Sequence, residues 1–243
     1  MSNHWDIYFC YVDDKYASFL LDMDIWKELD RNIYSYPICL RIYVKNPSET
    51  GFPIDQEADL INNLENCLIN DIGNRGFNVG RVTTDGVRDV YFYFKEPFNL
   101  EELASNYFSE HGYEIEMHII DEEEPWGIYF NYLYPNKYEI QHIRNSNVID
   151  SLRNSGDTTE KPRRVDHWIN LGNSENTESV KEKAKSLNFE IECAHTSDEE
   201  LTLQIFRTDY VDFNSINEVT DLIIEFIDEF DAEYDGWETQ VIK

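Results

Sequence analysis

The sequence predicts an α+β protein built from two units, each with helices packed on an antiparallel β-sheet. The chain has 243 residues, which is enough for two domains of common size, each with its own core. Hydrophobic residues make up 41% of it and aromatic residues 14%, which favours a packed, strand-rich protein over a disordered one. In both halves, segments with alternating apolar residues are interleaved with segments whose apolar residues recur at helical spacing.

The second half predicts one complete unit. Strands are expected at residues 165–171, 189–194 and 201–208, a helix at 177–187 and a final strand near 237–242. Ser215 and Glu218 have the spacing of a capping box, and the apolar residues from Ile216 to Phe230 then recur at helical spacing. The resulting β-α-β-β-α-β order is typical of the ferredoxin-like arrangement, in which two helices cover one face of a four-stranded sheet.

The first half predicts a copy of the same unit elaborated by extra strands. Strands are expected at 37–44, 113–120 and 126–134, a helix at 55–72, and an N-terminal hairpin at 5–12 and 16–23. Asp55 is expected to cap the helix. The dipeptide Asp85-Gly86 predicts a tight hairpin, because it tolerates positive φ, and the two strands that it joins are expected at 77–84 and 87–94. Asn99 is expected to start another helix and Gly112 to end it.

The two units are expected to divide the chain into residues 1–146 and 147–243. A polar stretch at 154–164 contains Gly156 and Pro162 and holds much of the local positive charge. Such a composition is typical of a connection between folded parts. We therefore expect the linker there.

The charge balance points to a basic protein as the partner. The chain has 49 acidic residues against 20 basic ones, which gives a formal net charge of -29. Such a field repels phosphate backbones, so direct binding of nucleic acid is not expected. It favours encounter with basic protein surfaces, and nucleases commonly have such surfaces. The alternative that the charge only keeps the protein in solution stays open.

The cysteines and the N-terminus favour the cytoplasm. The four cysteines are Cys10, Cys39, Cys67 and Cys193, and no two of them form a C-x-x-C pair. This pattern predicts reduced thiols rather than a disulfide framework or a zinc site. The first residues lack the basic and apolar regions of a signal peptide, and no apolar run is long enough to span a membrane.

No motif in the sequence indicates catalysis, a metal or a cofactor. The six histidines do not have the spacing of metal ligands, and the chain contains neither a nucleophile elbow nor a phosphate-binding loop. We therefore predict a protein that is not an enzyme. An enzyme or small-molecule binder that uses a cleft between the domains, around Arg81, Arg88 and His167, is the remaining alternative.

The last helix carries the strongest predicted binding surface. Its acidic residues lie at i+3 and i+4 steps opposite the apolar side, and they are Glu218, Asp221, Glu225, Asp228 and Glu229. Like charges at these spacings cost a helix a few tenths of a kcal/mol per pair. No lysine or arginine occurs between Arg207 and Lys243 to offset them. A partner-binding surface is one interpretation, and a solvated helix face is the other.

The stretch DAEYDGWET at 231–239 adds three candidate residues to this surface, Glu233, Asp235 and Trp237. Trp237 and Tyr234 are expected to pack where the last helix meets an edge strand, with Gly236 providing a bend. The acids are expected to face water. The stretch is therefore predicted to be a structural signature with an acidic rim.

The second half resembles the regulator of ribonuclease activity B family, which consists of small acidic bacterial proteins that inhibit ribonuclease E. The resemblance is carried by LRNSGD (152–157), VDHWINL (165–171), KAKSLNFEI (183–191) and above all DAEYDGWET. It implies a non-enzymatic regulator or inhibitor whose partner is an RNA-processing endoribonuclease. An immunity-type protein that neutralises a toxin nuclease would use the same pairing of acidic and basic surfaces, and it stays open as an alternative.

The first half resembles a bacterial domain-of-unknown-function family, number 695. The segments that carry this resemblance are WDIYFCYVDDKYASFLLDM, VGRVTTDGVRDVYFYF and PWGIYFNYLYP. This family brings no known activity with it. The two resemblances together cover nearly the whole chain.

Overall fold

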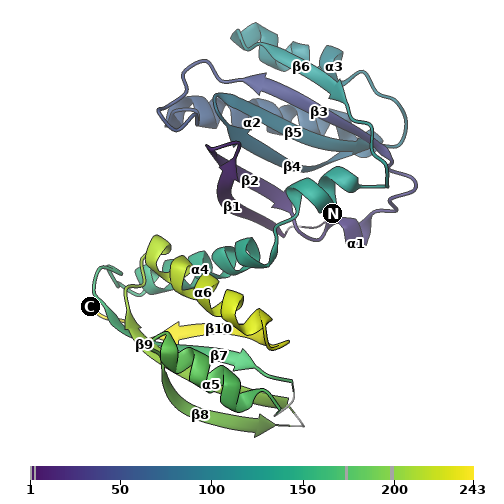
Figure 1. Cartoon of the computed structure of the whole chain (residues 1–243). Coiled ribbons are helices and arrows are strands. Elements are labelled where there is room, and N and C mark those ends of the chain that lie inside the picture. Colours follow the sequence, from purple (N-terminus) through teal and green to yellow (C-terminus); the bar gives the residue numbers. More distant parts are fainter. Residues whose placement is uncertain (1, 3, 173–174, 198–199) are drawn as a thin grey trace. The chain divides into compact units, whose positions relative to one another are not determined.

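The computed structural model describes residues 2, 4–172, 175–197 and 200–243 (Figure 1). The chain forms two compact units, Met1–Asn136 and Lys137–Lys243. The first contains a six-stranded sheet and the second a four-stranded sheet, and every strand pair in both is antiparallel. The α+β class with antiparallel sheets is thus confirmed.

The sheet of the first unit has the order β1-β2-β4-β5-β3-β6. Its strands are β1 (Trp5–Val12), β2 (Lys15–Asp22), β3 (Tyr36–Tyr43), β4 (Gly76–Thr84), β5 (Val87–Phe94) and β6 (Ile115–Ile119). The hairpin β4–β5 turns at Asp85 and Gly86, whose φ angles are 44° and 79°, as the dipeptide predicts.

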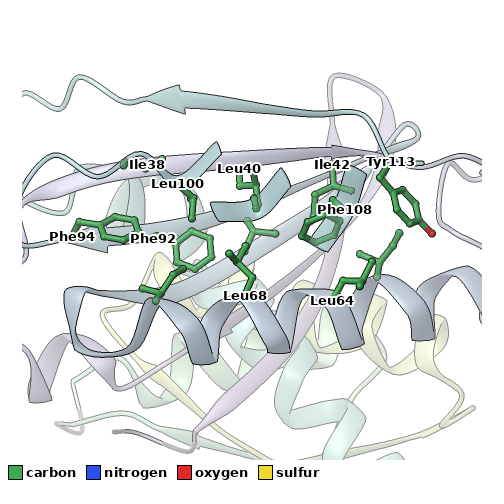
Figure 2. Packing of buried hydrophobic residues seen from close by; sticks show 14 of the residues in the cluster. Ile38, Leu40, Ile42, Leu64, Leu68, Phe92, Phe94, Leu100, Phe108 and Tyr113 are labelled. Atoms are coloured by element: carbon green, nitrogen blue, oxygen red, sulfur yellow. The ribbon is translucent and has the colours of Figure 1, made fainter. Parts of the chain in front are cut away.

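Helices cover one face of this sheet. They are α2 (Asp55–Ile72), followed by η1 (Gly73–Arg75), and α3 (Leu100–Phe108), followed by η2 (Ser109–His111); the short α1 (Ile25–Glu28) follows β2. Leu64 and Leu68 of α2 point toward the sheet, where they join a core built from β3, β5, α2 and α3 (Figure 2). Asn99 caps α3 by accepting the N–H of Glu102, as predicted, and Gly112 has the expected left-handed conformation.

Two expectations for the first unit are wrong. Asp55 is the first helical residue of α2, and no side chain caps that helix. Residues 126–134 do not form a strand: after Trp126 they form the short helix η3 (Tyr129–Leu133). The aromatic residues there favour a strand by propensity, but the buried Trp126, Tyr129 and Leu133 recur at helical spacing. Trp126 stacks on Tyr93 with ring centroids 4.6 Å apart, so the segment packs against β5.

The second unit has the sheet order β10-β7-β9-β8. Its elements are α4 (Lys137–Asn154), β7 (Arg163–Asn170), α5 (Thr177–Ser186), β8 (Glu190–Ser197), β9 (Glu200–Asp209), α6 (Phe213–Asp228) and β10 (Glu233–Thr239). Residues of α5 and α6 share one apolar core with β7 and β9. The last strand, expected near 237–242, begins earlier, at Glu233, and ends at Thr239. It includes most of the DAEYDGWET stretch.

The start of α6 also differs from the expectation. Its N-cap is Asp212, whose carboxylate accepts hydrogen bonds from the backbone N–H and the hydroxyl of Ser215 at 3.1 and 2.7 Å. Ser215 is therefore a donor within the first turn and not the capping residue. Asp212, three residues earlier, takes the capping role, and the helix begins one turn before the predicted position.

Helix α4 is the element that the sequence did not predict. It belongs to the second unit. Residues 154–164, which were expected to link the units, lie within that unit and run from the last residue of α4 to the first residues of β7. The boundary between 146 and 147 falls inside α4 and stays a prediction. Along the described part of the chain, no helix is both long and apolar enough to cross a membrane.

Candidate partner-binding surface

Helix α6 is covered on two sides. Its apolar side, with Val219, Ile223 and Phe226, packs on the sheet. A second side lies against α4, which runs beside α6 within the second unit (Figure 1). There Asn217 and Thr220 are buried, although both are polar. Only a narrow strip of α6 is left for solvent or for a partner.

We define the α6 acidic strip as Glu218, Glu225 and Glu229, which are all exposed. Glu218 and Glu225 lie two turns apart on the same side of the helix. Neither side chain has a hydrogen-bond or ion-pair partner among the residues that the structure describes. Glu229 lies 3.7 Å from the ammonium of Lys183, and such an exposed pair contributes little to stability. The strip is thus a row of carboxylates open to a partner.

The other two acids of the predicted ridge are paired with α4. The carboxylate of Asp221 lies 2.8 Å from His142 Nε2, and that of Asp228 contacts the ammonium of Lys137. The hydrogen bond with Asp228 raises the pKa of Lys137. The expectation that no base offsets these acids is therefore wrong. The partners are distant in sequence and lie on the helix that was not predicted.

Trp237 of the candidate set is buried in a polar network. Its indole N–H donates to Asn145 Oδ1 at 2.7 Å, and Gln141 Nε2 donates to the same atom at 2.8 Å. Asn145 Nδ2 in turn donates to Asn217 Oδ1 and Thr220 Oγ1, both at 2.9 Å. The network joins α4, α6 and β10. Trp237 therefore stabilises the packing of α4, α6 and β10 from within the core.

A β-bulge explains how the DAEYDGWET stretch presents its aromatics. The pairing of β10 with β7 shifts between Tyr234 and Gly236, so Asp235 is an extra residue in the strand. Gly236 has a φ of 144°, which only glycine adopts readily. As a result, Tyr234 and Trp237 both contribute to the cores on the helix-covered face, although they are three positions apart. The predicted bend at Gly236 is this bulge.

His167 lies in the core of the second unit. Its Nδ1 is 2.7 Å from the hydroxyl oxygen of Tyr234, and its Nε2 has no hydrogen-bond partner among the described residues. Burial, together with the nearby charge of Arg207, lowers the pKa of His167 to about 3. The histidine is therefore neutral near pH 7 and acts as a core residue.

Two acids of the candidate set, Glu233 and Asp235, are exposed as expected, but they belong to a second acidic face on the side of the sheet away from α5 and α6, which sequence reasoning did not distinguish. Arg164 Nη2 bonds Asp166 at 2.6 Å and Glu192 at 2.8 Å, and its guanidinium lies 3.8 Å from the ring centre of Phe206. The exposed acids on the neighbouring strand are Glu233, Asp235 and Glu238. Alternation of exposed and buried residues along β7 is the signal that marks this face.

Arg81 and Arg88 meet in the first unit. Arg81 Nη1 lies 3.0 Å from both carboxylate oxygens of Glu65, and Arg88 Nη1 lies 3.3 Å from one of them. Arg88 also donates to Asn62 at 2.7 Å. Burial lowers the pKa of Arg88, against the effect of Glu65. The predicted cleft residues are thus divided, with Arg81 and Arg88 in the first unit and His167 in the second. A cleft between the domains stays a prediction.

Solved structures resemble this chain only weakly. A structure titled "Crystal Structure of an Unknown Protein from Galdieria sulphuraria" is 9% identical, covers 85% of this chain and 99% of its own, and has a TM-score of 0.24. Another, titled "Crystal structure of an hypothetical protein", is 8% identical, with coverages of 99% and 97% and the same TM-score of 0.24. Scores this low carry no argument. The curated proteins contain no significant match.

The family models match both halves, in the order that the two resemblances imply. Residues 142–239 match the model of Regulator of ribonuclease activity B. The resemblance of the second half to this family is therefore confirmed from within α4 to the end of β10. Residues 3–134 match Family of unknown function (DUF695), and this match spans more than half of the chain. The chain therefore belongs to the DUF695 family, and the residues after this family's match are similar to Regulator of ribonuclease activity B.

Proposed function

We propose that this protein is a non-enzymatic regulator that binds a basic ribonuclease through the acidic surface of its second unit. The observation that carries the proposal is the match of residues 142–239 to Regulator of ribonuclease activity B. The formal charge of -29 supports a basic partner, since it would steer such a partner toward this surface. A cytoplasmic location is part of the proposal.

Some of the candidate residues are proposed to contact the ribonuclease directly, and the others to hold the second unit in shape. Glu218, Glu225 and Glu229 of the α6 acidic strip would face basic side chains of the ribonuclease, because nothing among the described residues neutralises the first two. Asp221 and Asp228 would act indirectly, by fixing α4. Glu233 and Asp235 lie on the face of the sheet away from α6, and they would offer the partner a second, separate acidic surface on β10. Trp237 would support the unit from the core.

We further propose that both units are ferredoxin-like. The elements β7-α5-β8-β9-α6-β10 of the second unit and β3-α2-β4-β5-α3-β6 of the first run in the order expected for this arrangement. In both, the first and third strands of the unit are neighbours at the centre of its four-strand set. The hairpin β1–β2 is then the elaboration of the first unit.

The test is a binding and inhibition assay with purified ribonuclease E, the enzyme that the sequence resemblance implies. The double variant Glu218→Lys/Glu225→Lys reverses the two unpaired charges. The matched control, Glu49→Lys/Glu110→Lys, reverses two exposed acids of the first unit and changes the net charge equally. We expect wild type and control to bind within about twofold of each other at low salt and the strip variant to lose at least about tenfold.

Three outcomes are informative. Equal loss in the control would mean that only net charge matters, and unchanged binding by the strip variant would exclude the strip. If wild type does not bind ribonuclease E, a pull-down from cytoplasmic extract at low and high salt decides between another RNA-processing nuclease and a toxin nuclease. Recovery of neither nuclease would overturn the proposed function.

A further inference from the structure

A pocket of about 430 Å³ lies within the first unit, between α2 and the strands β1, β2 and β4. Its volume is in the range typical of sites for small molecules. The apolar part of its wall includes Trp5, Leu20, Ile69 and Phe77. The α6 acidic strip belongs to the other unit, so this pocket is independent of the proposed ribonuclease contact.

The pocket exists because α2 does not fill the sheet surface beside β4. The apolar core under α2 and α3 is built from β3 and β5 and contains no residue of β1 or β2. The hairpin β1–β2 extends the sheet past this core, and Trp5 on its edge strand remains 38% exposed. On the pocket side of β4, the charged Arg81 takes the place of an apolar residue.

Arg81 presents an unused hydrogen-bonding edge to this pocket. Its Nη1 is occupied by the carboxylate of Glu65. Its Nε and Nη2 have no partner among the described residues, and the side chain keeps 21% of its surface exposed while lining the pocket. These two N–H groups are parallel donors whose spacing matches the two oxygens of a carboxylate.

The charges behind Arg81 favour a bound anion. Glu65 is nearly fully buried and is the one carboxylate that contacts both Arg81 and Arg88. Arg88 is also buried, and its other contacts are the neutral Asn62 and Thr83. Two guanidinium groups thus share one carboxylate. An additional anion at the exposed edge of Arg81 would balance the remaining positive charge.

The opposite part of the wall limits the ligand to one negative charge. Asp22 also lines the pocket, two positions along β2 from Leu20, which pairs with Arg81. Its exposure is only 2%, and one carboxylate oxygen accepts the N–H of Asp24. A second negative group on the ligand would be repelled there. The neutral amides of Asn66 and Asn70 lie on the α2 wall and can bond polar groups of the ligand.

We propose that this pocket binds a small organic carboxylate with a single negative charge and a flat, mostly apolar body. The carboxylate pairs with Nε and Nη2 of Arg81, and the body packs against Trp5 and Phe77. The first unit is then a ligand-binding domain.

The test uses the full chain and follows side-chain N–H signals by ¹H–¹⁵N NMR. The Nε–H signal of Arg81 is assigned by its loss in Arg81→Gln, and the indole signal of Trp5 by its loss in Trp5→Phe. Benzoate is the probe, benzamide is its neutral analogue and phenyl phosphate is the analogue with greater negative charge. We expect benzoate to shift both signals saturably and benzamide to shift neither.

Variants separate binding from structure. Arg81→Gln should weaken benzoate binding at least tenfold, as read from Trp5. Arg41→Gln is the control, because Arg41 pairs with Asp89 outside this pocket, and it should bind benzoate within twofold of wild type. If Arg81→Gln does not fold, Asn70→Trp decides, since it fills the pocket from α2 and leaves the Arg81–Glu65 pair intact.

The proposal is overturned if benzoate produces no saturable shift, if benzamide shifts the signals equally, or if the decisive variant binds like wild type. Tighter binding of phenyl phosphate than of benzoate would overturn the limit to one charge. Loss of binding in Arg41→Gln as well would show that the effect is a general one on stability.

Discussion

The indole N–H of Trp237 on β10 and the side-chain oxygen of Asn145 on α4 are 2.7 Å apart and buried. Asn145 is the centre of a network whose members lie on α4, α6 and β10. This relationship makes α4 part of the second unit. It also links the DAEYDGWET stretch to α4, whose own sequence has no clear apolar periodicity.

Replacing Asn145 should destabilise the second unit strongly. Asn145→Ala leaves the Trp237 N–H and the polar groups of Asn217 and Thr220 without their partner in a buried place, so we expect a loss of about 2–4 kcal/mol. The exposed Asn147→Ala on the same helix is the control and should change stability by less than about 0.5 kcal/mol. Urea unfolding followed by tryptophan fluorescence measures both. Equal effects would contradict the network's role.

Asp157, the last residue of the LRNSGD motif, should be a second weak point. Its buried carboxylate pairs with Arg163 and accepts the N–H groups of Thr159 and Ile242, both at 2.7 Å. Breaking such a buried pair typically costs about 3–5 kcal/mol, and we expect this loss for Asp157→Asn. The exposed Asp150→Asn should have almost no effect. Denaturant midpoints of the two variants provide the comparison.

The same carboxylate sets an acid limit on stability. The hydrogen bonds from Arg163 hold the pKa of Asp157 well below its ordinary value of 3.8. The folded state therefore keeps the charge when the unfolded chain takes up a proton, and the stabilisation is present above pH 3.8 and lost as the pH falls toward the folded pKa. Between pH 5 and pH 3, wild type should lose stability faster than Asp157→Asn. Parallel losses would contradict this assignment.

His167 should make the stability of the protein depend on pH in a higher pH range than Asp157 does. Burial lowers its pKa to about 3 from 6.5, so its contribution is complete above pH 6.5 and is lost as the pH falls toward 3. Each pH unit in this window lowers stability by as much as about 1.4 kcal/mol. The variant His167→Gln does not titrate, so its stability difference from wild type should shrink between pH 7 and pH 5. The exposed His118→Gln is the control.

Charge reversal should separate the two kinds of acid on α6. Asp221→Lys/Asp228→Lys places positive charge against His142 and Lys137 of α4, so we expect a melting temperature lower by several degrees. Glu218→Lys/Glu225→Lys relieves repulsion between acids and should leave the melting temperature unchanged or raise it. Calorimetry of both double variants measures the difference. Equal destabilisation would contradict the assignment of Asp221 and Asp228 to α4.

Sequence periodicity predicted the elements with regular patterns and failed where polar residues are buried. Alternation and turn residues placed β3, β4 and β5 within one or two positions of their observed bounds. Helix α4 escaped because Gln141 and Asn145, which are buried, break its apolar pattern. The ion pairs of Asp221 and Asp228 were missed for the same reason, since their partners lie on α4. No pattern in one sequence reveals a contact between such distant residues.

The bulge at Asp235 means that the DAEYDGWET stretch depends on Gly236 as much as on its aromatic residues. Successive side chains of a regular strand point to opposite faces, so residues three positions apart, such as Tyr234 and Trp237, would lie on opposite sides of the sheet. The bulge brings both rings to the core side, and it requires the φ of 144° that Gly236 adopts. A related chain of the same length with a β-branched residue at 236 would form a regular strand, turn the ring of Trp237 to the open face and lose its hydrogen bond to Asn145. A related chain with one residue fewer here would keep both rings on the core side without a bulge.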